Sequence, residues 1–208
     1  MTVKTYSAAK DGNTKLSKNF TVKEFRCNDG SDKILIDSDL VSYLQKIRDH
    51  FGKSVHVISG YRTLAYNSAV GGTSSSYHVK GQAADIQING VNPAIVAMYA
   101  ETIGAGGIGL YSYVSGGFVH VDSRAIKYRW LQITNNTRYQ QVNKMLPTLK
   151  QGSSNVENAV KLLQRKLGVN QSGTFGDYTS KAVRAFQTNN GLTVDGIVGL
   201  KTWSKLFS

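Results

Sequence analysis

The spacing of apolar residues predicts two main helices before residue 105. Between Asp37 and Phe51, apolar side chains recur every three or four positions, as on one face of an amphipathic helix, and Gly52 is suited to end it. Asn92-Pro93 predicts a second helix start, because asparagine caps a helix and proline favours its first turn. We expect that helix to run to about Ile103.

The polar start of the chain gives a weaker signal. Residues 1–19 show no clear period, and we expect them to be extended or loosely packed. Thr21 and Glu24 then have the spacing of a capping box, and Phe20 and Phe25 have the spacing of a hydrophobic staple. A short structural helix is therefore predicted to begin at Thr21.

Four segments are predicted to be strands of one sheet. They combine β-branched residues with alternation or bounding glycines, and they span residues 54–58, 84–88, 108–111 and 117–122. Ser115-Gly116-Gly117 is typical of a turn that joins the last two as a hairpin. Helices packed on a small, mainly antiparallel sheet give an α+β fold.

A second domain is predicted after a boundary rich in proline, glycine and serine at residues 146–154. We expect domains at 1–147 and 148–208. Beyond the boundary, Gly173–Val183 is echoed 23 positions later by Gly196–Leu206, each copy being a glycine turn that leads into a helix. With an earlier helix near 155–167, this predicts three short helices around Phe186, Trp203 and Leu206.

The charge of the chain indicates a polyanionic partner. The 208 residues include 25 Lys and Arg against 13 Asp and Glu, a formal net charge of +12. The basic residues are spread along the chain and match no nucleic-acid-binding motif, so a bacterial cell wall is favoured over nucleic acid. No stretch is long enough to span a bilayer, so no membrane insertion is expected.

Cysteine content and the first residues bear on location. Cys27 is the sole cysteine, so no internal disulfide can form, and its turn-like surroundings favour an inert thiol over a nucleophile. The first residues lack the apolar core of a signal peptide. If the wall partner lies outside the cell, we expect the protein to be made in the cytoplasm and released by a holin or cell lysis. We also expect a monomer.

His78 and Asp85 are candidate metal ligands. They flank Gly81, which allows a tight turn, and Ala83-Ala84, which add little bulk beside a buried ion. A hydrolytic zinc site uses three nitrogen or oxygen ligands and keeps a fourth position for water.

His120 is the candidate third ligand. The period of two in Phe118–Asp122 places His120 and Asp122 on one face of a strand. Of the other histidines, His50 is expected at a helix end, and His56 in the core or on the surface. From spacing alone, a metal site and ordinary packing or turn roles both remain open for these residues.

Four ordered motifs resemble the zinc peptidases of the D-alanyl-D-alanine carboxypeptidase type, which cut peptidoglycan stem peptides. They are Ser59-Gly60-Tyr61-Arg62-Thr63, Asn67-x-x-Val70-Gly71-Gly72, Ser76-x-His78-x-x-Gly81-x-Ala83-x-Asp85 and Phe118-Val119-His120-Val121-Asp122. The resemblance spans most of residues 15–131. It implies that His78, Asp85 and His120 bind zinc and that Arg62 pairs with a substrate carboxylate or carbonyl.

One position departs from this family. Many relatives carry a glutamate three positions before the last histidine as general base, where this chain has Gly117. Asp122 is the nearest carboxylate in sequence, so we assign it the base role. Ser76 is expected to hold the substrate or to orient His78, while Tyr128 and Trp130 line the cleft or simply cover the sheet.

The C-terminal repeat is similar to the small peptidoglycan-binding domain of many wall hydrolases. The matching residues are Leu163-Gln164, Ala185-Phe186-Gln187 and Asp195-Gly196. Together the two resemblances imply a zinc-dependent peptidoglycan hydrolase of the endolysin or autolysin type, with the wall as its partner.

Two questions stay open at this stage. The bond could be that of a D,D-carboxypeptidase, of an endopeptidase cutting cross-bridges, or of an endopeptidase between L-alanine and D-glutamate. The alternative function is a non-catalytic wall-binding protein with a structural zinc site.

Overall fold

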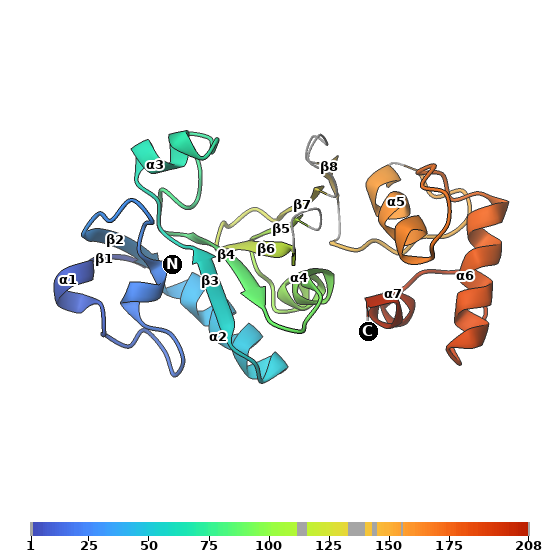
Figure 1. Cartoon of the computed structure of the whole chain (residues 1–208), viewed down its shortest axis with the longest axis horizontal. Coiled ribbons are helices and arrows are strands. Elements are labelled where there is room, and N and C mark those ends of the chain that lie inside the picture. Colours follow the sequence, from blue (N-terminus) through green and yellow to red (C-terminus); the bar gives the residue numbers. More distant parts are fainter. Residues whose placement is uncertain (1, 112–115, 133–139, 143–144, 155, 208) are drawn as a thin grey trace. The chain divides into compact units, whose positions relative to one another are not determined.

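The computed structural model forms two compact units, Met1–Tyr128 and Arg129–Ser208 (Figure 1). The structure describes residues 2–111, 116–132, 140–142, 145–154 and 156–207. None of the helices within these ranges has the length and apolar character needed to cross a bilayer. The domain boundary expected between residues 147 and 148 stays a prediction.

The N-terminal residues are more ordered than their composition suggests. Strand β1 (Val3–Ser7) pairs antiparallel with β2 (Lys33–Asp37) in a two-stranded sheet, and a short helix α1 (Ala8–Asp11) follows. Of the two expected alternatives, the extended one is confirmed for Val3–Ser7, while Ala8–Asp11 forms a helix instead. Alternation is weak in β1 because its side chains are mostly exposed, and its order comes from backbone pairing with a segment distant in sequence.

The predicted helix signals are confirmed. A short 3₁₀ helix spans Val22–Phe25, and the backbone N–H of Thr21 donates to Oε2 of Glu24 at 2.6 Å. The rings of Phe20 and Phe25 lie 6.2 Å apart, as a hydrophobic staple requires. Helix α2 spans Ser38–Phe51 and ends at Gly52, whose φ of 62° suits a left-handed cap.

The main sheet has six strands in the order β3-β4-β6-β5-β7-β8. The pairs β3–β4, β4–β6, β5–β6 and β7–β8 are antiparallel, in agreement with the predicted α+β class. The strands are β3 (Val55–Ser59), β4 (Ala83–Ile88), β5 (Gly107–Tyr111), β6 (Phe118–Asp122), β7 (Tyr128–Gln132) and β8 (Gln140–Gln141). Strands β5 and β6 form the expected hairpin, although Ser115 of its turn lies outside the described residues.

Two helices contribute apolar side chains to the core of the first unit. Helix α4 (Pro93–Thr102) packs against β5 and β6, and α2 packs against β3 and α4. The buried residues of α4 are all apolar, so the apolar face of β6, with Val119 and Val121, belongs with them. The opposite face of β6 is left for His120 and Asp122. In the sequence, helix α3 (Leu64–Ala69) comes after β3 and before β4.

In the part of the C-terminal unit that the structure describes there are three helices, α5 (Glu157–Lys166), α6 (Asp177–Asn189) and α7 (Leu200–Phe207). Trp203 is fully buried and its indole N–H donates to the carbonyl of Pro147 at 3.0 Å. Leu206 is also buried, as expected, but Phe186 is only half-buried. Phe175, from the glycine turn before α6, fills the core instead.

The sequence repeat is also a repeat of hydrogen bonds around two buried glutamines, Gln164 and Gln187. Each glutamine Oε1 accepts a glycine N–H, and each Nε2 contacts a side-chain oxygen, a backbone carbonyl and a threonine hydroxyl. The equivalent partners are Gly173 and Gly196, Ser172 and Asp195, Thr174 and Ile197, and Thr179 and Thr202. Each glutamine therefore ties a turn to a helix.

Replacing either buried glutamine should destabilise the C-terminal unit. Gln164→Ala leaves the N–H of Gly173 and the carbonyl of Thr174 without this partner, and we expect a loss of about 2–4 kcal/mol in unfolding free energy. Gln187→Ala should cost a similar amount. Denaturant-dependent hydrogen exchange of residues 156–207 measures the change. Gln171→Ala, at an exposed position next to the same turn, is the control, and equal stabilities for all three variants would contradict the role of the glutamines.

Candidate metal centre

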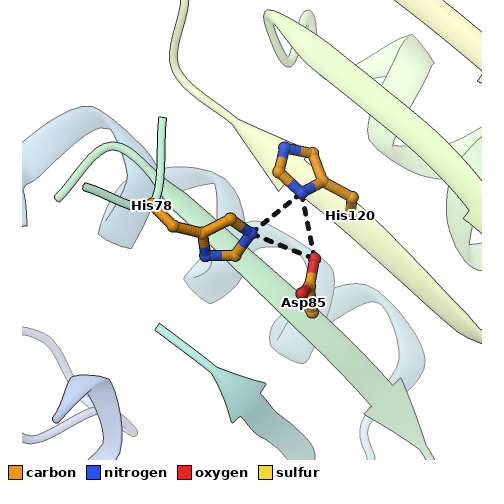
Figure 2. A group of neighbouring side chains, drawn as sticks. All are labelled: His78, Asp85 and His120. Atoms are coloured by element: carbon orange, nitrogen blue, oxygen red, sulfur yellow. Dashed lines mark hydrogen bonds and ion pairs between the residues drawn. The ribbon is translucent and has the colours of Figure 1, made fainter. Parts of the chain in front are cut away.

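His78, Asp85 and His120 meet at one buried point (Figure 2). Nε2 of His78 lies 3.3 Å from Oδ1 of Asp85 and 3.1 Å from Nδ1 of His120, and that Nδ1 lies 2.9 Å from Oδ1 of Asp85. The three side chains are 3–8% exposed. Two imidazole nitrogens and one carboxylate oxygen therefore face one another away from bulk solvent.

Sheet register brings two of these residues together. Asp85 on β4 is directly opposite His120 on β6. His78 comes from the turn that leads into β4, where the N–H of Gly81 donates to its carbonyl at 3.0 Å. Gly81 has a φ of 70°, and a Cβ there would lie 2.4 Å from the carbonyl oxygen of Leu35, so a larger residue does not fit this turn.

Each histidine is held through its other ring nitrogen. Nδ1 of His78 lies 2.7 Å from the carbonyl oxygen of Gly60, and Nε2 of His120 lies 3.1 Å from Oδ2 of Asp122. Because both partners are acceptors, these nitrogens carry the protons of the neutral rings. The lone pairs of His78 Nε2 and His120 Nδ1 are then directed at the common point. This arrangement is typical of metal-binding histidines.

Asp122 sits behind His120 and is fully buried. Its Oδ1 accepts from the N–H of Gly107 at 2.7 Å, and its Oδ2 accepts from Nε of Arg124 at 2.8 Å as well as facing His120. A Cβ at Gly107 would lie 2.1 Å from Oδ2, so glycine makes the room for this carboxylate. Asp122 contacts the nitrogen of His120 that points away from the three converging atoms. This geometry does not support the general-base role expected from sequence.

Arg62 fixes the other oxygen of Asp85. Its Nη2 lies 2.6 Å from Oδ2 of Asp85, and its Nε donates to Oγ of Ser59 at 2.7 Å. Asp85 therefore presents Oδ1 to the two histidines and Oδ2 to the guanidinium. A carboxylate divided in this way is suited to bind a metal through one oxygen.

The electrostatics of the cluster favour a cation at its centre. Burial opposes ionisation of His120, but hydrogen bonds to Asp122 and Asp85 and the charges of both carboxylates raise the pKa of His120 to about 9. Burial also opposes ionisation of Asp85, yet the charge of His78 and hydrogen bonds from His120 and His78 hold the pKa of Asp85 well below its usual range. Burial opposes ionisation of Asp122 as well, but hydrogen bonds from His120 and Arg124 lower the pKa of Asp122.

The three donor atoms fit a zinc ion. Zinc bonds of about 2.0–2.2 Å at tetrahedral angles place ligand atoms roughly 3.3–3.6 Å apart, close to the observed separations of 2.9–3.3 Å. Two nitrogens and one oxygen form the borderline donor set that zinc accepts. Three protein ligands also leave a fourth position open.

The remaining candidate residues lie at different depths around the centre. Oγ of Ser76 accepts from the backbone N–H of His78 at 3.3 Å. This bond supports the turn and does not involve the imidazole ring. The guanidinium of Arg124 stacks 4.2 Å from the ring of Tyr77 and 5.3 Å from that of Tyr128. Trp130 is buried, with 7% of its surface exposed, which favours its role as cover for the sheet.

The single cysteine and the two remaining histidines are not part of the cluster of His78, Asp85 and His120. Cys27 is a buried free thiol whose sulfur accepts from the N–H of Thr63, in keeping with an inert residue. His50 stacks on Tyr99 with ring centroids 3.7 Å apart at the end of α2. His56 is exposed on β3.

Sequence reasoning missed three supports of the centre. The carbonyl of Gly60 left no pattern of its own, since any residue supplies a carbonyl. Gly107 was not singled out, because a glycine that makes room for a side chain distant in sequence leaves no local pattern. Arg124 lies two residues beyond Asp122, and this spacing of two is the signal that could have linked the two side chains.

Two family models match the chain. The peptidase M15 model matches residues 18–122, and a model of a peptidoglycan binding domain matches residues 152–206. The first match includes all three converging side chains together with Arg62 and Asp122. The second covers both buried glutamines, helices α5 and α6, and α7 up to residue 206.

Curated relatives match the first unit. The peptidoglycan L,D-endopeptidase MepK of Escherichia coli K12 is 36% identical over 95 residues, which cover 42% of this chain and 51% of that protein. An uncharacterized protein of Kitasatospora aureofaciens is 46% identical over 67 residues, covering 29% of this chain and 55% of its own length. This chain thus spans about half the length of the curated relatives it matches.

Among solved structures, a peptidoglycan-binding protein from Clostridioides difficile in complex with glutamine hydroxamate is 33% identical to this chain. The match covers 34% of this chain and 46% of that one. Its TM-score of 0.29 is too low to support an argument about the fold.

Removing the charge of Asp122 should weaken metal binding. In Asp122→Asn the partner of His120 Nε2 is a neutral amide that can no longer enforce one ring tautomer, and we expect zinc affinity to fall about 10–100-fold. Competition with a chromophoric chelator measures the affinity. Asp49→Asn makes the same change at an exposed position of α2 and should bind zinc like the unmodified protein. Unchanged affinity together with lost turnover would instead restore the general-base assignment.

Zinc affinity should also depend on pH. Because the pKa of metal-free His120 is raised to about 9, zinc must displace a proton from this ring below that pH. We expect affinity to rise about tenfold per pH unit towards pH 9 and then to level off. The same proton stabilises the metal-free fold fully below the unfolded pKa of 6.5, and this contribution is lost as pH rises through 9. Chelator competition at several pH values tests the slope, and a flat profile between pH 7 and 9 would contradict it.

Proposed function

The chain belongs to the peptidase M15 family, and from this premise we propose that it is a zinc-dependent hydrolase that cleaves a peptide bond in peptidoglycan. The observation that carries the proposal is the buried cluster of His78, Asp85 and His120. Both histidines have their outer nitrogens held by acceptors, so that their lone pairs converge with one oxygen of Asp85. Burying polar groups in this arrangement costs folding free energy unless a cation binds between them.

An open site favours catalysis over the structural-zinc alternative. Structural zinc is normally enclosed by four protein ligands, whereas catalytic zinc has three and one exchangeable position. The residues that could hold the ion here are His78, Asp85 and His120. When bound, zinc supplies Lewis acidity, which activates water and polarises a peptide carbonyl.

The surrounding residues then divide the work. We assign Asp122 to positioning His120, because its oxygens are committed to His120, Gly107 and Arg124. Arg62 positions Asp85, and its side chain is 16% exposed, which leaves part of the guanidinium for a substrate carboxylate or for the carbonyl oxygen as charge develops on it. Tyr128, half-buried against Arg124, is placed to form part of the wall on that side.

Peptidoglycan is the substrate that agrees with both units. The C-terminal match is to a peptidoglycan binding domain, and the E. coli relative is named a peptidoglycan L,D-endopeptidase. That name directs attention to bonds between L and D residues, of which the bond from L-alanine to D-glutamate is one. A net charge of +12 favours binding to an anionic wall. A wall-binding module would raise the local enzyme concentration on an insoluble substrate.

Muropeptide analysis tests this function directly. Purified peptidoglycan digested with the full chain should release products whose masses identify the bond, and a chelator should abolish release until zinc is restored. His78→Ala should lose zinc and activity. His56→Ala, which removes an exposed histidine of β3, should retain both.

Two outcomes would reject the proposal. Product release that survives complete metal removal would dismiss zinc chemistry. Wall binding without any new muropeptide, by a zinc-loaded protein, would favour the non-catalytic wall-binding alternative.

A further inference from the structure

The C-terminal unit has a hollow of about 460 Å³ beside the first copy of its repeat. It lies where the loop after α5 meets the first turn of α6, the two orange helices labelled in Figure 1. Its volume falls in the range of about 300–1,000 Å³ that is usual for small-molecule sites. The lining residues are Gln164, Asn170, Ser172, Thr174, Gly176 and, at the start of α6, Asp177, Tyr178 and Thr179.

The floor of the hollow is rigid. Gln164 is 1% exposed, and its amide is bonded to Ser172, Thr174, Thr179 and the N–H of Gly173. These bonds fix the loop relative to α6 before any ligand arrives. A site fixed in advance loses little conformational entropy on binding.

The rim combines an aromatic ring with polar groups. Tyr178 is 68% exposed, so most of its ring surface is accessible to a ligand. Asn170, Ser172 and Asp177 are exposed beside it and offer an amide, a hydroxyl and a carboxylate. Such a rim matches a sugar, whose C–H groups pack on an aromatic face while its hydroxyl and acetamido groups form hydrogen bonds.

The charge of the lining distinguishes among wall components. It includes no lysine or arginine, and Asp177 is its one charged side chain, accepting from Nε2 of Gln151. The carboxylates of a stem peptide and the phosphates of teichoic acid would find no cation there. A neutral sugar meets no such penalty.

We propose that this hollow binds an N-acetylhexosamine unit of the wall glycan, with its ring against Tyr178. This inference rests on the proposed function, in which peptidoglycan is the substrate, and it specifies that the C-terminal unit binds the sugar part of that polymer. The second copy of the repeat carries Lys201 at the position equivalent to Tyr178 and Ile197 at that of Thr174, so its corresponding face lacks the aromatic ring and the hydroxyl.

Binding of a neutral N-acetylglucosamine oligomer to the zinc-loaded full chain tests the site. Titration calorimetry should detect binding, and Tyr178→Ala should weaken it roughly three- to tenfold. Asn170→Ala should weaken it as well. Lys201→Ala changes an exposed residue at the equivalent position of the second copy and should leave affinity for this uncharged probe unchanged. All variants should keep full activity on a soluble stem peptide, since none touches the metal centre.

Other results would overturn the inference. It fails if Tyr178→Ala binds the oligomer as well as the unmodified chain does. It also fails if the oligomer does not bind while an isolated stem peptide binds and loses affinity in Tyr178→Ala, because the occupant is then the peptide. Activity on the soluble peptide reports separately on the proposed function, so loss of sugar binding with intact turnover rejects the sugar site alone.

Discussion

The pairing of Asp85 with His120 across β4 and β6 is the constraint on which the metal centre depends. Side chains alternate across a strand, so a slip of one residue would bring Val119 or Val121 to this face and bury His120 among the apolar residues near α4. The apolar face of β6 specifies the register because it has to pack in the core. Folding of the hydrophobic core thereby places the candidate metal ligands Asp85 and His120 opposite each other.

A second constraint is the compensation of buried charge. Asp85 and Asp122 are both buried, and carboxylates at such depth require partners. Arg62 and Arg124 each neutralise one carboxylate from outside the cluster, while His120 lies between the two. Gly107 provides the space for Asp122, and Asp122 contacts the ring of His120, so a residue with no side chain helps to orient a candidate metal ligand.

The sequence was sufficient to predict the α+β class, the main helices and the three converging residues, because each left a local pattern: an apolar stripe, a capping pair or a period of two. It was insufficient where the cause is not local. Strand β1 is ordered by a distant partner, and the period of two places Asp122 on the face of His120 without saying which ring nitrogen it contacts. That choice depends on the rotamer of His120 and on the room left at Gly107, neither of which has a sequence signature. Phe186 was overestimated as a core residue because the helical repeat does not show how deeply a position is buried.

Both units bury polar side chains, but they satisfy them in opposite ways. Around Gln164 and Gln187 the glutamine amide meets partners supplied by the protein itself, so each cluster is complete and holds a turn. At the candidate metal centre the outer atoms of His78, His120 and Asp85 have protein partners, while their inner atoms face one another. Such atoms can be satisfied by a shared proton, which raises the pKa of His120, or by a cation. A buried polar cluster whose groups are all satisfied by protein partners stabilises a fold. A cluster whose inner atoms are satisfied only by an added positive charge is suited to bind a cation.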